Sequence, residues 1–419
     1  MKMGTLSFTG NATYIPYTLP NGTLLIKHSR MANSFGLSVS DANNQLPSIY
    51  AIPKLHKNPY KFRMITSATK CTTKPVSLLL LSVLKKFDSH LKNYCNKVSV
   101  TAHYNPYWPI DNSLTVIHKF LSQPELQNAT HIQSFDFSTL FPSLPHAEIK
   151  KALYWLTDFL FKNSGKPYLA TSSYYSYYCD SEPKSSQFTL LSPSSVKELI
   201  NCVVDESYVT FAGHVFQAIC GVPQGGNASP LIATLTLTVM ELKFYQNSTN
   251  RSLIKQSLYF CRYIDDLLCV NCSNFSDIAK QIYPDSLPLT TSSSTSSDSK
   301  CDFLDLTLSL SPFSISVYNK TDDFNFDVLR YVHNDSNVAS SLGYNVFIAQ
   351  IIRFSRICTD FSDFKNKSQD LFSIFLTHGF AKSQLICKLV HCFKRHPQIL
   401  AKFSLHTHNL FHLANRLVK

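Results

Sequence analysis

The chain has 419 residues, of which 44% are hydrophobic and 13% aromatic, enough for two or three domains with buried cores. Its formal net charge of +12 favours a polyanionic partner, most simply nucleic acid. No apolar stretch is long enough to cross a bilayer and no apolar signal segment opens the chain, so we expect an intracellular protein without a membrane. Only one Cys-x-x-Cys pair occurs, Cys269 and Cys272, and a zinc ribbon is therefore not expected.

Residues 1–45 are polar and without a clear period, which predicts a loosely ordered arm. A hairpin is predicted next, from a strand at Ile49–Ile52, a proline-bounded turn and a second strand at Lys61–Thr66. Several cations on one hairpin suit a triphosphate or backbone phosphates, although lysines also protect an exposed sheet edge. The cations of this hairpin and its flank are Lys54, Lys57, Arg63 and Lys70.

Asp136 ends a short apolar segment that predicts a buried strand, and a helix is predicted from about His146 to Phe161. An Asp at the end of a core strand can be a metal ligand, but it is more often a helix cap. A second acidic site further along the chain favours the ligand role for Asp136.

A Ser- and Tyr-rich stretch, about 163–195, predicts an irregular insertion. A helix at Val196–Val204 and a hairpin at Tyr208–Ala218 follow, and then a Gly/Pro loop leads into a helix at Leu231–Tyr245. In that loop, glycine lets the backbone approach a ligand closely, and Gln224 offers both a donor and an acceptor beside Gly225.

The segment Tyr259–Val270 places an acidic pair, Asp265 and Asp266, between two apolar runs. This pattern predicts two buried strands joined by a tight turn that brings both carboxylates to one rim. Adjacent carboxylates in apolar surroundings are costly unless a cation neutralises them, and Mg²⁺ prefers such oxygen ligands. A solvated turn between two core strands is the simpler alternative.

A second hairpin is predicted from Phe303–Leu308 and Ser314–Tyr318, and the chain is helical from about Asn337 to its end. The helical part carries Arg353 and Arg356 and predicts either a bundle that grips a duplex or a solvated basic face.

The order of these pieces resembles the reverse transcriptases from about Ile49 to Tyr318. Finer features resemble the Penelope-like retroelement branch, a relative of telomerase, and extend the similarity to about residue 390. They are Ile52-Pro53-Lys54-Leu55-His56-Lys57, Leu144-Pro145-His146, Arg262-Tyr263-Ile264-Asp265-Asp266, Phe303-Leu304-Asp305 and Tyr318-Asn319-Lys320-Thr321-Asp322. That branch often has Met where Gln224 stands, and no Gly-Ile-Tyr/Tyr-Ile-Gly endonuclease signature follows here.

The resemblance implies an α+β right-hand polymerase with fingers at 46–130, a palm at 131–320 and a helical thumb and tail at 321–419. The palm would be a split βαβ antiparallel sheet with helices on one face. Two Mg²⁺ ions, or Mn²⁺, would be held by Asp136, Asp265, Asp266 and the Phe137 carbonyl. Lys54, Arg63, Phe141, Gln224 and Gly225 would bind the nucleotide. Lys57, Lys70, Tyr263, Phe303, Leu304, Arg353 and Arg356 would bind primer and template.

The implied activity is RNA-directed DNA synthesis, in which dNTPs extend a DNA primer on an RNA template in the nucleus, with a separate endonuclease or host factor as a further partner. Lys280 and Lys300 are weak candidates for a general acid. Two other readings remain at this stage: an RNA-dependent RNA polymerase, which shares the palm and the Asp-Asp turn, and a catalytically silent nucleic-acid-binding protein.

Overall fold

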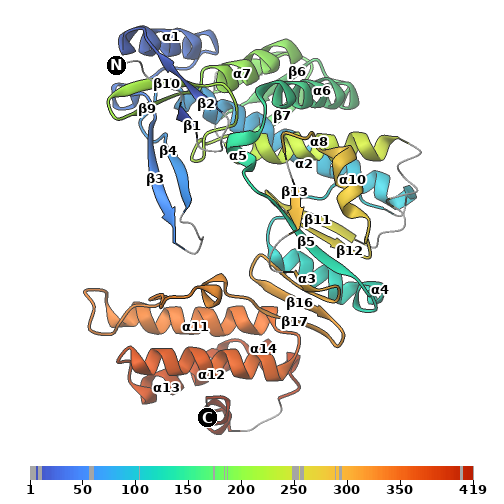
Figure 1. Cartoon of the computed structure of the whole chain (residues 1–419), viewed down its shortest axis with the longest axis vertical. Coiled ribbons are helices and arrows are strands. Elements are labelled where there is room, and N and C mark those ends of the chain that lie inside the picture. Colours follow the sequence, from blue (N-terminus) through green and yellow to red (C-terminus); the bar gives the residue numbers. More distant parts are fainter. Residues whose placement is uncertain are drawn as a thin grey trace.

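The computed structural model of the protein is an α+β fold with a sheet-rich upper part and a helical lower part (Figure 1). The structure describes residues 6–7, 12–55, 61–102, 104–172, 175–183, 185, 187–247, 254, 259–287, 289–291, 295–405 and 409–418. Lys57 lies outside these residues.

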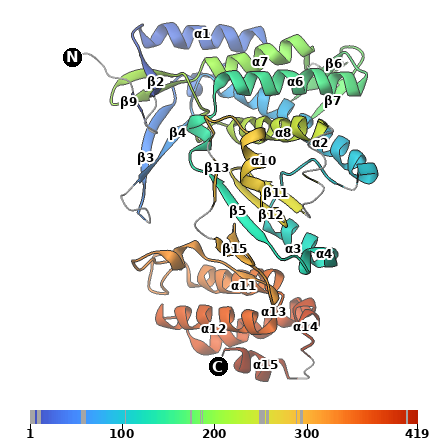
Figure 2. The same cartoon turned by 45° about the vertical axis from the view of Figure 1, so that its right-hand side comes forward.

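The fingers are built on a six-stranded sheet whose outermost hairpin projects toward the helical lower part (Figures 1 and 2). This hairpin has the predicted cations in register, with Ile52 opposite Arg63 and Lys54 opposite Lys61. In spatial order the strands are β1 (Leu6–Ser7), β2 (Ala12–Tyr17), β10 (His214–Ala218), β9 (Tyr208–Phe211), β3 (Ser48–Lys54) and β4 (Lys61–Ser67). Helix α1 (Asn21–Ser34) and the short helix η1 (Asp41–Asn43) complete this part.

The N-terminal segment differs from the loosely ordered arm expected for residues 1–45. Strand β2 pairs with β10, about two hundred residues away in the chain, with Tyr17 opposite Val215. Tyr14 is buried among Ile49 and Phe216 of the same sheet. The polar composition of residues 1–45 did not predict this strand, because the strand is stabilised by pairing with a partner that is distant in the sequence. The same pairing places β9 and β10 in the fingers sheet, although they fall within the range expected for the palm.

The palm sheet has the order β11–β12–β5–β13 and is covered on both faces. Along β12, Leu267 and Cys269 enter a first core with the palm helices, while Leu268 and Val270 enter a second core. Alternate side chains of a strand point to opposite faces, so a continuous apolar run suits a strand buried on both sides. The strands are β11 (Tyr259–Tyr263), β12 (Asp266–Val270), β5 (Ile132–Phe137) and β13 (Leu289–Thr291). The first-core helices are α2 (Lys74–Ala102), α5 (Leu140–Ser143), α6 (His146–Ser164), α7 (Pro193–Asp205), α8 (Ser229–Gln246) and α10 (Phe275–Ile282).

The second core joins the palm to the thumb through a four-stranded sheet below the palm (Figure 1). Its strands are β14 (Thr295–Ser297), β15 (Lys300–Phe303), β16 (Leu306–Leu310) and β17 (Phe313–Val317), flanked by α3 (Ser113–Ser122) and α4 (Pro124–Gln127). The thumb follows the short helix η2 (Lys320–Asp323) and consists of α11 (Ser340–Ile357), α12 (Phe361–Thr377), α13 (Lys382–Arg395), α14 (Pro397–Lys402) and α15 (Leu410–Leu417). In the described part of the chain, no helix has the length and apolar character needed to cross a membrane.

The stretch expected to be an irregular insertion at about 163–195 instead contains a three-stranded sheet, β7–β6–β8. Its strands are β6 (Tyr168–Thr171), β7 (Ser176–Cys179) and β8 (Thr189–Leu191). Tyr178 packs edge-on against Phe161 and forms a hydrogen bond with His90, so this tyrosine docks the small sheet on the palm helices. The Ser and Tyr content suggested a loop, and tertiary packing decided otherwise.

Candidate active site

The three acidic residues singled out in the sequence meet at one end of the palm sheet. Asp136 on β5 and Asp266 on β12 are directly paired residues of neighbouring antiparallel strands. Asp265 precedes Asp266 in the turn, and its carbonyl accepts a hydrogen bond from the Phe137 backbone N–H at 3.3 Å. The backbone therefore places all three acidic residues at the same end of the palm sheet.

The turn that presents Asp265 is unusually tight. Tyr263 pairs with Asp266, which leaves only Ile264 and Asp265 as the loop of the β11–β12 hairpin. Ile264 has a φ of +56°, a left-handed conformation that a β-branched residue adopts only under external constraint. The two-residue turn itself demands a positive φ, and neighbouring side chains add to the constraint.

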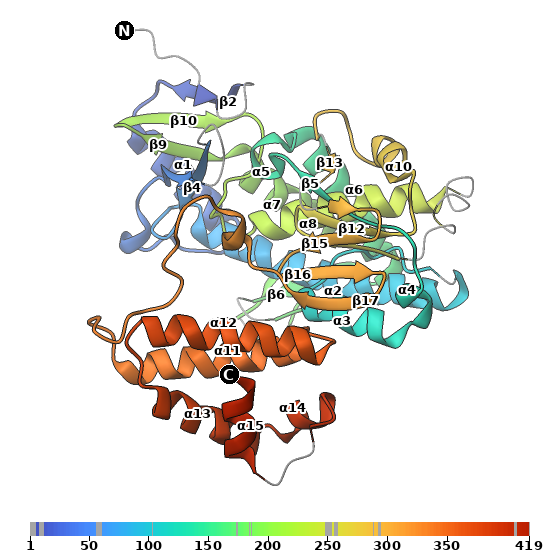
Figure 3. The ribbon, with the colours of Figure 1, turned by 60° about the horizontal axis from the view of Figure 1, so that its bottom comes forward.

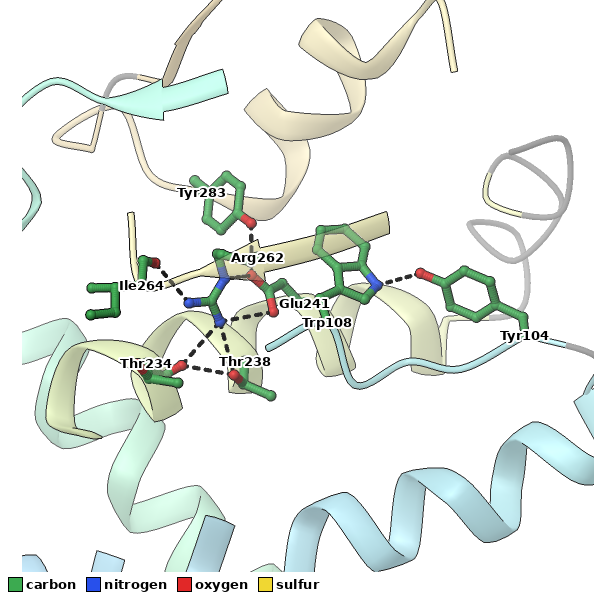
Figure 4. Close-up of polar contacts among 8 residues, drawn as sticks. All are labelled: Tyr104, Trp108, Thr234, Thr238, Glu241, Arg262, Ile264 and Tyr283. Atoms are coloured by element: carbon green, nitrogen blue, oxygen red, sulfur yellow. Dashed lines mark hydrogen bonds and ion pairs between the residues drawn. The ribbon is translucent and has the colours of Figure 1, made fainter. Parts of the chain in front are cut away.

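Arg262 supplies that constraint from a fully buried position (Figure 4). Its Nη1 donates to the Ile264 carbonyl at 2.9 Å. Its Nε donates to Glu241 Oε1 at 2.6 Å and its Nη2 to Glu241 Oε2 at 3.1 Å. Nη2 also donates to the Thr238 hydroxyl and the Thr234 carbonyl on α8. The planar guanidinium thus ties the strained turn to the helix beneath the sheet.

The partners of Arg262 are held in turn. The Tyr283 hydroxyl donates to Glu241 Oε1 at 2.8 Å. The backbone of Arg262 bonds on its other edge to the segment 108–110, through its N–H to the Trp108 carbonyl and its carbonyl to the Ile110 N–H, both at 2.9 Å. Trp108 Nε1 donates to the Tyr104 hydroxyl (Figure 4). Both the guanidinium and the backbone of Arg262 are therefore held by hydrogen bonds within the protein itself.

Two of the acidic residues at the rim, Asp265 and Asp266, have raised pKa values. Burial, and then the neighbouring charges of Asp265 and Asp136, raises the pKa of Asp266 to about 7. Burial also raises the pKa of Asp265, against the opposing effect of the cations Arg63, Lys54 and Lys320. A cluster that resists ionisation in this way is the environment that a divalent cation relieves.

The chemistry of these oxygen donors fits Mg²⁺, which typically takes one or two carboxylates and completes its shell with water and substrate phosphates. In the residues that the structure describes, no three acidic, His or Cys side chains converge as a ready-made metal cage.

A cleft of about 120 Å³ opens beside the acidic rim, between the fingers hairpin and the palm. Its lining brings together residues that are far apart in the sequence, among them Asp265 and cations of β3 and β4. The predicted site residues that line it are Lys54, Arg63, Phe137, Phe141, Gln224 and Asp265. Tyr14, which sequence reasoning left in the arm, also lines it.

The Gly-rich loop is locked against both sides of this cleft. The Gln224 carbonyl accepts from the Thr66 N–H of β4 at 2.6 Å, and a Cβ on Gly225 would lie 2.2 Å from the Thr66 carbonyl oxygen. A Cβ on Gly221 would lie 2.6 Å from the Phe141 carbonyl. The glycines are therefore needed for close backbone packing between fingers and palm. Gly225 supports the cleft, while Gln224 faces it.

The residues expected to bind primer and template lie in different environments: some are buried or form ion pairs, and others are exposed. Phe303 is 2% exposed in the second core, so its side chain is a packing residue and not a contact surface. Arg353 forms an ion pair with Asp305 at 2.9 Å, which ties α11 to the β15–β16 turn. Leu304, with a φ of +57°, is partly buried in that turn.

Tyr263, Lys70 and Arg356 are exposed, and their roles stay predictions. Lys280 pairs with Asp277 on α10.

Sequence reasoning missed the part played by Lys320. This residue lies in η2, directly after the palm, and its charge lowers the pKa of both Asp265 and Asp266. The sequence contained the residue within a recognisable motif, but nothing in its spacing indicated that the chain returns there to the acidic rim.

Fold and site together define a right-hand nucleic-acid polymerase. Residues 52–304, more than half of the chain, match the family described as reverse transcriptase (RNA-dependent DNA polymerase). The chain therefore belongs to the reverse transcriptase family, whose members are RNA-directed DNA polymerases. Residues 330–390 match a second family, described as an animal helix-turn-helix domain. Comparison with curated protein sequences gives no match.

Among solved structures, telomerase from Candida albicans is similar at a TM-score of 0.58 and 15% identity, over 95% of this chain and 64% of that one. The chain thus spans just under two thirds of that telomerase, and the likeness shows the shared fold. Apo telomerase from Candida tropicalis gives a TM-score of 0.47 at 12% identity, over 95% and 67% of the two chains. The RNA polymerase complex inside a double-stranded RNA virus gives 0.44 at 10% identity, over 85% and 29%.

We predict that Arg262→Met destabilises the protein by about 3–5 kcal/mol, because it leaves the Glu241 carboxylate buried without its partner. The double variant Arg262→Met/Glu241→Gln removes both charges and should recover most of this loss in urea unfolding. Primer extension should nevertheless stay at least about tenfold below wild type in the double variant, since the Ile264 carbonyl has lost its donor. Wild-type extension by a stable double variant would show that the turn needs no such support.

We predict that Asp266→Asn stabilises the metal-free protein at high pH. An unfolded Asp titrates near about 3.9, so ionising Asp266 opposes folding increasingly between about pH 4 and pH 7 and fully above that range. Melting in EDTA should show a higher Tm for the variant at pH 8, by about 2–4 °C for each kcal/mol relieved, and equal Tm values near pH 4. A gain that is the same at both pH values would point to packing instead of charge.

Proposed function

We propose that the protein extends the 3′ end of a primer with dNTPs on an RNA template, by nucleotidyl transfer assisted by two divalent metal ions. The observation that carries this proposal is the pairing of Asp136 with Asp266 beside Asp265, at the mouth of a cleft lined by Lys54 and Arg63. A polymerase site needs carboxylates that bind metal ions and positively charged side chains that bind the triphosphate. Both kinds of residue occur beside this cleft.

In this mechanism the aspartates hold the metal ions and the fingers hold the nucleotide. Asp136, Asp265 and the Phe137 carbonyl are the proposed ligands, and Asp266 supports the cluster. When bound, divalent metal supplies an activated primer hydroxyl and charge stabilisation on the triphosphate. Lys54 and Arg63 bind the triphosphate from the opposite wall, while Gln224 orients the base side of the nucleotide. Most of the rate enhancement then comes from positioning and charge.

We further propose that the chain belongs to the Penelope-like branch and acts in the nucleus on an RNA–DNA duplex, with a separate endonuclease or host factor supplying the 3′ end. The motifs at 52–57, 144–146, 262–266, 303–305 and 318–322 support the branch. The thumb shares its core with the palm hairpins, and this supports a role for the thumb in holding the duplex next to the acidic rim. Fingers, palm and thumb at 46–130, 131–320 and 321–419 remain the proposed functional division, with β9 and β10 joined to the fingers.

Asp265→Asn should abolish synthesis while leaving folding and duplex binding nearly intact. Loss of a metal ligand removes about 4 kcal/mol of transition-state stabilisation, or roughly a thousandfold in rate. The measurement is extension of a primed RNA template with dNTPs and Mg²⁺, together with the Tm and the duplex affinity. Asp285→Asn, an exposed Asp of the same palm, is the matched control and should extend normally. Extension by Asp265→Asn at the wild-type rate would remove the metal assignment.

Phe141→Ala should admit ribonucleotides. Phe141 lines the cleft five residues after Asp136, where a bulky ring beside the sugar leaves a 2′-hydroxyl no room and no partner, at about 1–3 kcal/mol. The measurement is the ratio of kcat/KM for dNTP over rNTP on one primed template. The ratio should be high in wild type, fall about tenfold or more in Phe141→Ala, and persist in Phe141→Tyr, which keeps the ring. A wild-type ratio below one would instead support an RNA polymerase.

A further inference from the structure

The C-terminal part of the chain carries most of the excess positive charge. Residues 371–419 contain no Asp or Glu, and their seven Lys and Arg residues account for more than half of the net charge of +12. These residues are Lys382, Lys388, Lys394, Arg395, Lys402, Arg416 and Lys419. One of them, Lys402, is used internally, because its Nζ donates to the Ser355 carbonyl at 2.7 Å. Helix α13 carries four of the others.

Helix α13 follows α12 after a short turn, at positions 378–381. Gly379 has a φ of +81°, and the turn is closed by backbone bonds from Gly379 N–H to the Leu376 carbonyl and from Phe380 N–H to the Phe375 carbonyl. A turn of three or four residues that contains glycine is the kind of connection found in a helix-turn-helix. The helix-turn-helix family match at 330–390 covers α11, α12 and the first part of α13.

The two faces of α13 differ sharply. Its buried residues are apolar: Leu385, Ile386, Leu389, Cys392 and Phe393. The opposite face has exposed residues at helical spacing, and they form one polar and basic stripe: Gln384, Lys388, His391 and Arg395, flanked by Lys394. Because the apolar face is already buried in the thumb, α13 has none to insert into a lipid surface. The exposed side chains of this stripe are polar or positively charged, and they suit a polyanionic partner.

The stripe points away from the proposed polymerase cleft. Helix α11 packs against α13 and lies between it and the palm (Figures 1 and 3). The stripe is on the face of α13 opposite to its buried side, so a duplex held between thumb and palm does not reach it. A nucleic acid that contacts the stripe would therefore be separate from that duplex.

We propose that α13 is a recognition helix that binds a DNA duplex in its major groove, separately from the primer–template. B-form DNA has a major groove wide enough for one helix, whereas the deep and narrow groove of A-form RNA excludes it. Gln384 and Lys388, in the first half of the helix, face the base edges, and Lys394 and Arg395 contact phosphates. The inference goes beyond polymerase activity: it gives the enzyme a grip on duplex DNA while the cleft holds the RNA–DNA hybrid.

The test uses the full chain and a short, blunt, fluorescent DNA duplex, with a saturating unlabelled RNA–DNA hybrid present to fill the cleft. Wild type should still bind the duplex, and binding should weaken with salt. The double variant Lys394→Gln/Arg395→Gln should raise the Kd about tenfold or more and lower the log–log salt slope by about 2, at about 0.9 per phosphate. A duplex RNA of the same sequence should compete poorly.

The matched control is Lys97→Gln/Lys162→Gln, which removes two exposed charges on α2 and α6 and should bind like wild type. Primer extension should be unchanged in both double variants. Duplex DNA binding by Lys394→Gln/Arg395→Gln equal to that of the control, full displacement of the DNA by the hybrid, or equal competition by duplex RNA would each overturn the proposal. Failure of the polymerase proposal itself would appear separately, as wild-type protein that binds DNA but extends no primer.

Discussion

The buried contact between Arg262 and Glu241 is the interaction on which the catalytic geometry depends. A β-branched residue with positive φ at the tip of a two-residue turn is unfavourable alone, and Arg262 offsets this by donating to its carbonyl. An ion pair taken wholly out of water is rarely a gain in stability by itself, because desolvation cancels much of the attraction. Its value here is positional, since one planar group fixes β11, the turn and α8 with respect to each other.

Around that contact, the palm strands are covered on both faces, and this has a functional consequence. The first core carries the palm helices, and the second continues through β15–β17 into the thumb. A rigid sheet between two packed layers holds Asp136 and Asp266 in register. The thumb is anchored to the β15–β16 turn of the adjoining sheet by the ion pair of Arg353 with Asp305. Catalytic rim and thumb are thereby parts of one packed body.

Electrostatics divide the molecule into three zones. The rim has carboxylates whose pKa values are raised by burial, the facing hairpin and η2 bring cations toward them, and the thumb beyond α12 has no acidic residue. Negative charge is concentrated where a metal ion and a triphosphate can satisfy it, and positive charge where phosphates would lie. The net charge of +12 thus has a spatial arrangement that composition alone does not show.

The sequence by itself determined the class of the protein, because the chemistry sits in short local patterns. The apolar runs around Asp265 and Asp266, the strand ending in Asp136 and the loop with Gln224 and Gly225 each predicted their element. Tertiary structure decided what depends on partners distant in the chain: the pairing of β2 with β10, the sheet within 168–191, the burial of Phe303 and the approach of Lys320 to the rim. Local propensity and spacing are written in neighbouring residues, whereas strand partners and long-range charge contacts are selected only when the whole chain packs.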